Sequence, residues 1–192
     1  MTINSFSTRE LRWFIKAHLA KGSQPSQPLL SWLLDKSSLT TKLVKLSKGN
    51  FKVKVLRQIR TRASRSEAQA LGISRHSIVL VREVLLMGNH QPWVFARSLL
   101  PLSSLNGSLR HLRKQGTRPL GAFLFSQPHL QRGAIALAQI SQHHAYVPPT
   151  LLDNVAVWGR RSVFYIDSKP LLVSEVFLPS FPAVVADRSP LR

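Results

Sequence analysis

The stretch SIVLVREVLLMGNHQPWVFARSLLP, residues 77–101, carries the clearest structural signal in this sequence. Apolar residues fill the segments on both sides of Gly88 and Asn89, a pair typical of a tight turn between antiparallel strands. We therefore predict a hairpin of two long strands that ends at Pro101. VWGRRSVFYI and PLLVSEVFLP, which flank residues 167–169, predict a second hairpin.

Helical patterns are inserted between these strands. Residues 28–50 contain leucines at helical spacing and predict a pair of helices, whereas residues 51–59 alternate as a half-exposed strand. RGAIALAQI, residues 132–140, predicts a helix of small residues, and residues 141–154 predict a loop. Strands in antiparallel order with helices between them indicate an α+β fold.

The length of 192 residues suits one domain with a full core. We expect a basic helical arm and linker at residues 1–28, the main domain at 29–182 and a tail at 183–192. No apolar run approaches the roughly 20 residues of a membrane helix, and the start lacks a signal peptide, so we expect a soluble, cytoplasmic protein. The absence of cysteine excludes disulfides, thiolate nucleophiles and cysteine-based zinc sites.

The charge is strongly unbalanced, with 27 Lys and Arg residues against 8 Asp and Glu residues and a net charge of +19. Such a field favours nucleic acid, an anionic membrane surface or a small polycarboxylate or phosphate. We expect no specific nucleic-acid binding, because Trp93, Phe95 and Phe177 follow core patterns instead of forming an exposed aromatic surface. His143 and His144 lack the spacing of a ligand pair, so we predict exposed loop histidines and no metal site.

Three charged residues share strand faces with apolar neighbours: Arg82, Arg97 and Glu175. A buried Arg–Glu pair without further meaning would explain any one of them. Taken together, two arginines and one carboxylate leave a positive excess that an anion would complete. A guanidinium holds a carboxylate through two hydrogen bonds, and an apolar wall suits a ring, so the pattern indicates a cyclic carboxylate as ligand.

Glu83 leaves an alternative open. It lies on the opposite face of its strand from Arg82 and could pair with an arginine such as Arg57 or Arg160.

Several stretches together resemble the chorismate pyruvate-lyase family, the first committed enzymes of bacterial ubiquinone synthesis. They are VREVLLMGNHQPWVFARSLLP, GTRPLGAFLF, VWGRRSVFYI and KPLLVSEVFLP, in the family's order, and the resemblance covers about residues 29–180. It implies a six-stranded antiparallel sheet with inserted helices and a ligand buried beneath a helix-turn-helix flap. It also implies an enzyme that converts chorismate to 4-hydroxybenzoate and pyruvate without metal or organic cofactor. We expect a monomer.

The resemblance assigns roles to five residues. Arg82 matches the arginine that anchors the ring carboxylate, and Glu175 matches the glutamate near the ring hydroxyl, which we hypothesise also takes the ring proton. Leu120 matches a contact residue in the T-x-PLG turn, and Leu39 stands where the best-known members carry a methionine. We further expect Arg97 to bind the enolpyruvyl carboxylate.

An alternative is a non-catalytic sensor for a small carboxylate, because effector-binding domains of some bacterial transcription regulators share the lyase fold. Such regulators carry a DNA-binding domain ahead of it, and only about 28 residues precede the matching part here. We therefore expect the enzyme. Residues 126–156 are longer than the resemblance leads us to expect, so it assigns them no role.

Overall fold

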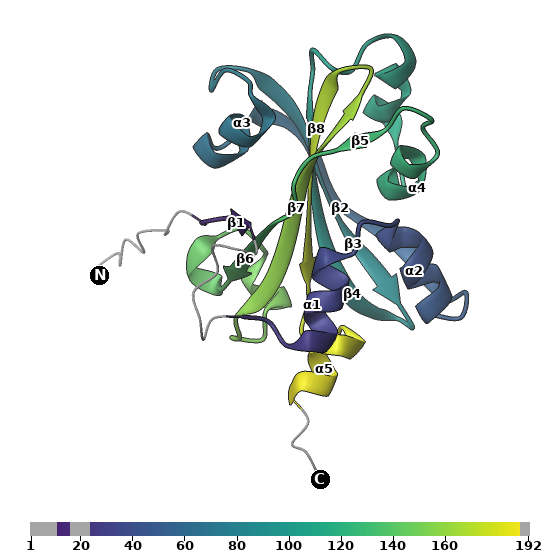
Figure 1. The fold of residues 1–192 in the computed structure, drawn as a ribbon, viewed down its shortest axis with the longest axis vertical. Coiled ribbons are helices and arrows are strands. Elements are labelled where there is room, and N and C mark those ends of the chain that lie inside the picture. The colour runs from purple at the N-terminus through teal and green to yellow at the C-terminus, as the bar shows by residue number, and fades with distance from the viewer. Residues whose placement is uncertain (1–10, 16–23, 189–192) are drawn as a thin grey trace.

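The computed structural model describes residues 11–15 and 24–188 and confirms an α+β fold built on one antiparallel sheet (Figure 1). The strands run in the order β1-β6-β7-β8-β4-β3-β2, and β5 pairs with β7. Eight strands replace the expected six, because two segments of two residues, β1 and β5, join the edges. The bounds are β1 Phe14–Ile15, β2 Phe51–Arg62, β3 Ile78–Gly88, β4 Gln91–Pro101, β5 Gln131–Arg132, β6 Ala136–Ile140, β7 Val157–Ile166 and β8 Lys169–Phe177.

Both predicted hairpins are confirmed. Asn89 and His90 connect β3 to β4, and Asp167 and Ser168 connect β7 to β8. All four residues have positive φ, between 49° and 67°. Two-residue turns of this kind match the right-handed twist of the strands they join, so each hairpin has a fixed register. The two hairpins pair through β4 and β8 and form the centre of the sheet.

Helices cover both faces of the sheet (Figure 1). We call the face that carries Arg82 and Leu86 the front face, and the face that carries Glu83 and Leu85 the back face. Leucines of α1, α2 and α4 pack on the front, while α3 and residues 141–155 pack on the back. The helices are α1 Gln27–Leu34, α2 Leu39–Leu46, α3 Arg65–Leu71, α4 Leu120–Phe125 and α5 Pro182–Arg188, with 3₁₀ helices at Gly107–Lys114, Gln142–His144 and Pro149–Leu151.

The helix predicted for residues 132–140 is wrong. This segment instead supplies Arg132 of β5 and all of β6, and both strands pair with β7. The open edge of β7 offers backbone hydrogen bonds and a half-buried surface, and this tertiary context outweighs the helical preference of alanine.

The expected N-terminal helix falls mostly outside the described residues. Within it, Phe14 and Ile15 form β1 and pair with β6. Residues 182–188, which include the start of the expected tail, form α5, and this helix contacts α1. Where the structure describes the chain, no helix is long and apolar enough to cross a membrane.

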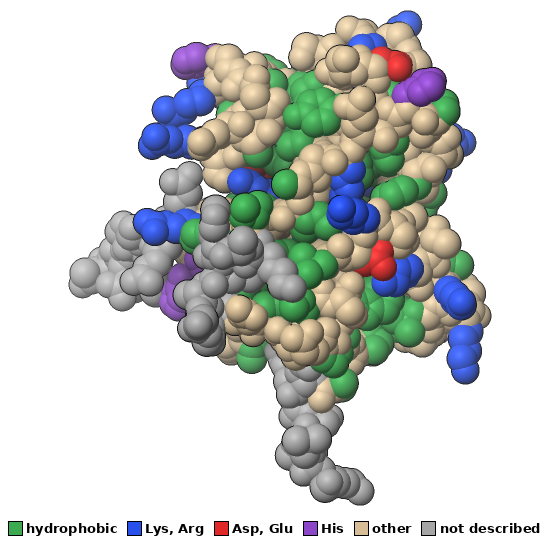
Figure 2. Space-filling model, in the orientation of Figure 1, with side chains coloured by type: hydrophobic (Ala, Val, Ile, Leu, Met, Phe, Trp, Pro, Cys, Tyr) green, Lys and Arg blue, Asp and Glu red, His purple; other side chains and the backbone are tan. Residues whose placement is uncertain are grey.

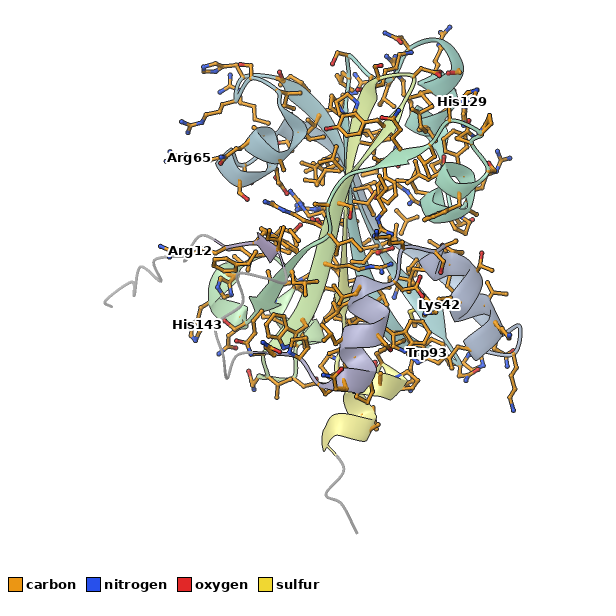
Figure 3. The ribbon with its side chains drawn as sticks, viewed as in Figure 1. Arg12, Lys42, Arg65, Trp93, His129 and His143 are labelled. Atoms are coloured by element: carbon orange, nitrogen blue, oxygen red, sulfur yellow. The ribbon has the colours of Figure 1, made fainter. Side chains whose placement is uncertain are left out.

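Positive side chains are distributed over the surface. On the face shown in Figure 2, Lys and Arg side chains lie in separate groups near the edges and the middle, and not in one continuous band. The labelled Arg12 and Arg65 lie at the periphery on the same side of the molecule (Figure 3).

Candidate active site

A small cavity lies on the front face, between the central strands and the helices α2 and α4. Its volume is about 40 Å³, and it brings together four of the five residues singled out in the sequence, Leu39, Arg82, Leu120 and Glu175. Most of its remaining wall is apolar. The other lining residues are Thr40, Val53, Val84, Leu86, Ala96, Ser98, Pro119, Gly121, Leu124, Phe125, Phe164 and Val173.

Arg82 is a buried cation without a counter-ion. Its side chain extends from β3, and the residue is only 3% exposed. One terminal nitrogen donates hydrogen bonds to the backbone oxygens of Gly116 and Arg118, at 2.7 and 3.2 Å. Its Nε is buried without a hydrogen-bond partner, and no carboxylate of the described residues forms an ion pair with it. Burial lowers the pKa of Arg82, and an anionic ligand would relieve this cost.

Glu175 forms an ion pair with a buried arginine. It extends from β8 beside β7, where Arg160 is its register partner, and Arg160 Nε donates to Glu175 Oε2 at 2.6 Å. The arginine is 2% exposed and also donates to the backbone oxygens of Trp32 and Asp35, at 2.8 and 2.6 Å. This ion pair accounts for an acid on an apolar face. No other described residue donates to Glu175, so its Oε1 is available to a ligand.

Leu39 and Leu120 are the first residues of α2 and α4, so both helices begin at the cavity. Backbone N–H groups in a first helical turn have no partner within the helix. The two helices approach closely at Gly121, where a Cβ would lie only 2.9 Å from the Oγ1 of Thr40. Glycine at this position therefore allows α4 to pack against α2 over the cavity.

Arg97 does not belong to this cavity, contrary to our expectation. In the β3–β4 register Arg82 stands opposite Ser98 and Glu83 stands opposite Arg97, so Arg97 extends from the back face. There its Nε donates to Glu67 at 2.8 Å, and NH1 forms an ion pair with Glu83. The sequence pattern marked Arg97 as inward-facing but could not distinguish two buried faces of one sheet.

Alternation along this strand predicts that Trp93, Phe95 and Leu99 share the face of Arg97, but the structure divides them between the two faces. Phe95 and Leu99 lie in back-face clusters, as predicted, whereas Trp93 packs with the front-face cluster. The register shifts between Leu86 and Met87, and this irregularity in the β3–β4 pairing breaks the alternation.

The charges around Arg97 form a closed network. Burial would raise the pKa of Glu67, but hydrogen bonds from Arg97 outweigh it and lower that pKa. Burial would likewise lower the pKa of Arg97, but its bonds to Glu67 raise it. Glu83 also accepts from Arg57 at 2.6 Å, which confirms one of the two partners considered for it. The other, Arg160, pairs with Glu175 instead.

A larger cavity of about 840 Å³ lies over this network on the back face. Its lining includes both glutamates and Arg97, together with Arg161. Arg161 donates to the Oγ of Ser66 at 2.8 Å and lies 4.8 Å from the ring centre of Trp13. Size alone would select this cavity, but Arg97, the arginine at its base, is already neutralised.

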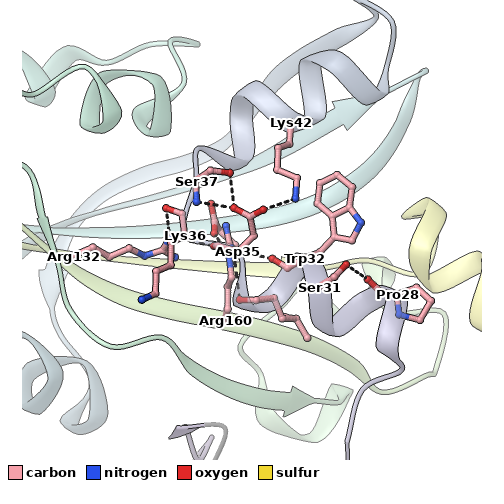
Figure 4. A network of polar contacts seen from close by, with 11 residues as sticks. Pro28, Ser31, Trp32, Asp35, Lys36, Ser37, Lys42, Arg132 and Arg160 are labelled. Atoms are coloured by element: carbon pink, nitrogen blue, oxygen red, sulfur yellow. Dashed lines mark hydrogen bonds and ion pairs between the residues drawn. The ribbon is translucent and has the colours of Figure 1, made fainter.

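Sequence reasoning assigned no role to Arg132, and considered Arg160 only as a partner for Glu83. Arg132 donates to the Oγ of Ser162 at 3.1 Å and to the backbone oxygen of Lys36 at 3.1 Å (Figure 4). Alternation along β7 could have placed Arg160 on the front face with Phe164. Arg132 gave no such signal, because its segment was predicted to be helical.

The histidine pair lies in the 3₁₀ helix Gln142–His144. His143 is exposed and lies at the periphery in Figure 3, while His144 bonds to Ser141 within its own loop. Across residues 11–15 and 24–188, no group of three or more His, Cys, Asp or Glu side chains could hold a metal ion.

Comparison with known proteins relates this geometry to one family. A family model described as chorismate lyase matches residues 13–185. A probable chorismate pyruvate-lyase from Psychromonas ingrahamii is 44% identical over 160 residues, which cover 81% of this chain and 84% of the relative. A protein with the same description from Thiobacillus denitrificans is 39% identical, over 82% of this chain and 86% of the relative. Another from Pseudomonas putida is 38% identical, over 94% of this chain and 95% of the relative.

Solved structures show the fold alone. PhnF from Mycobacterium smegmatis matches with a TM-score of 0.52 and 18% identity, over 76% of this chain and 65% of its own. The C-terminal domain of the histidine utilization repressor from Pseudomonas syringae matches with a TM-score of 0.51 and 12% identity, over 74% and 96%.

Proposed function

The chain belongs to the chorismate lyase family, and we propose that it eliminates pyruvate from chorismate to give 4-hydroxybenzoate, a precursor of ubiquinone. Arg82 is the observation that carries this proposal. A desolvated guanidinium with a free Nε, set in an apolar wall, suits the carboxylate of a ring-shaped anion. The sensor alternative is not favoured, because relatives over most of the chain are described as lyases.

The reaction needs little from the protein beyond placement and charge. The bond between the ring carbon and the enolpyruvyl oxygen breaks, and its electron pair leaves with that oxygen. The neighbouring ring carbon, which carries the hydroxyl, loses its proton, so the ring becomes aromatic. The departing enolate takes a proton on its methylene carbon and becomes pyruvate. Aromatisation supplies much of the driving force, so orientation and electrostatic stabilisation are the protein's main tasks.

Arg82 and Glu175 would hold opposite ends of the ring. We assign the ring carboxylate to the Nε side of Arg82 and the ring hydroxyl to Oε1 of Glu175, which no described residue engages. The carbon that loses its proton carries this hydroxyl, so Glu175 stands near both groups. Arg160 fixes the orientation of the carboxylate through Oε2.

The front cavity must open before a substrate can enter. Ligand sites usually measure about 300–1,000 Å³, far more than the roughly 40 Å³ enclosed here. The start of α2 forms one part of the cover and α4 the other. Movement of this cover would then precede chemistry, and reopening would accompany product release.

The direct test is conversion of chorismate by the purified protein in the presence of a metal chelator. We expect 4-hydroxybenzoate, followed by its absorbance, and an equal amount of pyruvate, measured with a coupled dehydrogenase. If the protein binds 4-hydroxybenzoate but forms no product, the sensor function replaces the lyase.

Replacing Glu175 with Gln separates its two possible tasks. If Glu175 takes the ring proton, kcat should fall about 10²- to 10⁴-fold while 4-hydroxybenzoate still binds. Single-turnover kinetics would check this, because slow product release could hide a change in the chemical step. A fall of less than about fivefold in the single-turnover rate would leave Glu175 with a positioning role only.

A further inference from the structure

We propose that Arg132 binds the carboxylate of the enolpyruvyl group and stabilises this group as it leaves, an inference that rests on the proposed lyase function. The starting point is the charge balance beside the front cavity. Glu175 is paired with Arg160, and Asp35 is paired with Lys42 at 2.7 Å.

Two guanidinium groups on this face remain without a carboxylate. Within the described part of the chain, neither Arg82 nor Arg132 forms an ion pair. Chorismate carries two carboxylates, one on the ring and one on the side chain. The number of unpaired front-face guanidiniums therefore matches the charge of the substrate. Arg97, which the sequence suggested for the second carboxylate, is neutralised on the other face.

Arg132 lies directly beside the cavity. Its register partner in β7 is Phe164, which lines the cavity, and its guanidinium lies 5.0 Å from the centre of that ring. Figure 4 shows Arg132 reaching the loop between α1 and α2, where NH1 donates to the backbone oxygens of Lys36 and Asp35, at 3.1 and 3.4 Å. These bonds hold the guanidinium beside the cavity, where it forms no ion pair with any described carboxylate.

The surroundings favour an anion at this point. Burial and the neighbouring charge of Arg160 lower the pKa of Arg132 to about 10, so the side chain stays protonated near neutral pH. The carboxylates of Glu175 and Asp35 offset this cost only in part, so a carboxylate of the ligand would stabilise the charged form of Arg132. Lys36 adds a further positive charge at the exposed edge of the same region.

The substrate's own geometry directs the leaving group to this end. The enolpyruvyl ether and the hydroxyl stand on adjacent ring carbons, and the ring carboxylate stands across the ring from the hydroxyl. A ring held by Arg82 at one end and Glu175 at the other therefore places the side chain on the Glu175 side. Arg132 is close enough to Glu175 for the two charges to interact. A second cavity of about 550 Å³, lined by Arg132 and Lys36, adjoins the front cavity at Phe125, which lines both.

Arg132 would act most strongly as the carbon–oxygen bond breaks. The leaving group then carries its carboxylate and a new enolate charge, so a fixed guanidinium stabilises the transition state more than the bound substrate. The product 4-hydroxybenzoate retains only the ring carboxylate, and its binding should not depend on Arg132.

This difference between substrate and product provides the test. We would measure kcat/KM for chorismate and the inhibition constant of 4-hydroxybenzoate in Arg132→Gln, Arg132→Lys and the matched control Arg82→Gln. Arg132→Gln should lower kcat/KM about 10²- to 10³-fold and leave the inhibition constant within about twofold. Arg132→Lys should recover part of the loss, and Arg82→Gln should weaken substrate and product alike.

Unchanged binding of 4-hydroxybenzoate would also show that the Arg132→Gln protein is folded. Equal weakening of substrate and product in this variant would make Arg132 a structural tie to the α1–α2 loop and overturn the proposal. An unchanged kcat/KM would overturn it as well. Turnover by the unmodified protein reports on the lyase function separately, because it does not depend on the outcome for Arg132.

Discussion

Arg97 on the back face lies between two buried glutamates, whereas Arg82, on the neighbouring strand, is buried on the front face and forms no ion pair with a described carboxylate. The two faces use adjacent residues of the same strands. Glu83, Arg97, Ser174 and Arg161 stand in one register row across β3, β4, β8 and β7, and all belong to the back face. The residues next to them along the chain, among them Arg82, Ser98 and Glu175, line the front cavity.

The difference shows that a buried charge is not by itself the mark of a binding site. On the back face Arg97 and its glutamates compensate one another. Arg161 lines the large cavity above them and forms no ion pair with a described carboxylate, but it donates a hydrogen bond to the Oγ of Ser66. On the front face the cavity is small, but the desolvation of Arg82 is uncompensated. The missing partner, and not the size of the space, identifies the site.

The largest expected effect is a loss of activity on replacing Arg82, which distinguishes Arg82 from Arg97. Arg82→Met should reduce kcat/KM for chorismate by at least about 10³-fold, because it removes both the charge and the two-pronged contact with the ring carboxylate. Its melting temperature should stay the same or rise, since an unpaired buried charge is lost. Parallel thermal unfolding and kinetic assays would check this. A strongly destabilised Arg82→Met protein would mean that Arg82 is structural, like Arg97.

The next effect concerns stability on the back face. Arg97→Met should destabilise the protein by about 3–5 kcal/mol, because two buried carboxylates lose their shared cation. Arg57→Gln is the matched control: it contacts Glu83 as well, but its side chain is 52% exposed, so about 1 kcal/mol or less is expected.

Urea unfolding of both variants would measure these free energies. Similar losses of unfolding free energy in Arg97→Met and Arg57→Gln would show that burial does not determine how much each ion pair stabilises the protein.

The smallest effect is a pH dependence. The pKa of Glu67 is lowered in the folded protein from its ordinary value of 4.5, despite burial, by its bonds to Arg97. A lowered folded pKa stabilises the protein above the unfolded value, and this contribution is lost as the pH falls through the folded pKa. In Arg97→Met the carboxylate of Glu67 stays buried without its cation, so protonation of Glu67 stabilises the folded protein.

The stability gap between the unmodified protein and Arg97→Met should therefore narrow as the pH falls from 7 towards 4. The urea unfolding midpoints of both proteins, measured at several pH values, would reveal this narrowing. A gap that does not change with pH would show that Glu67 titrates alike in both proteins.

Much of this architecture was predictable because local patterns were strong. The turn signals at Gly88–Asn89 and at residues 167–169 predicted both hairpins, although the first turn lies one residue later, at Asn89 and His90. Period-two alternation placed Arg82 and Glu175 inward. Leu39 and Leu120, taken from the family resemblance, also line the cavity. Local reasoning failed for residues 132–140, where pairing with the edge of β7 decided the conformation of an alanine-rich segment.

The sequence by itself determined the two long hairpins and the presence of inward charges, since these depend on neighbours a few positions apart. Only the tertiary structure decided which inward charges meet. Alternation assigns a side chain to one of two faces but does not say what covers that face, and in this sheet both are covered. Arg97 therefore meets the glutamates of β3 and α3, and Glu175 meets Arg160. Among the described residues, Arg82 and Arg132 form no ion pair. Burial costs and ion pairing act through space, so the distinction between a structural charge and a binding charge appears only in the folded chain.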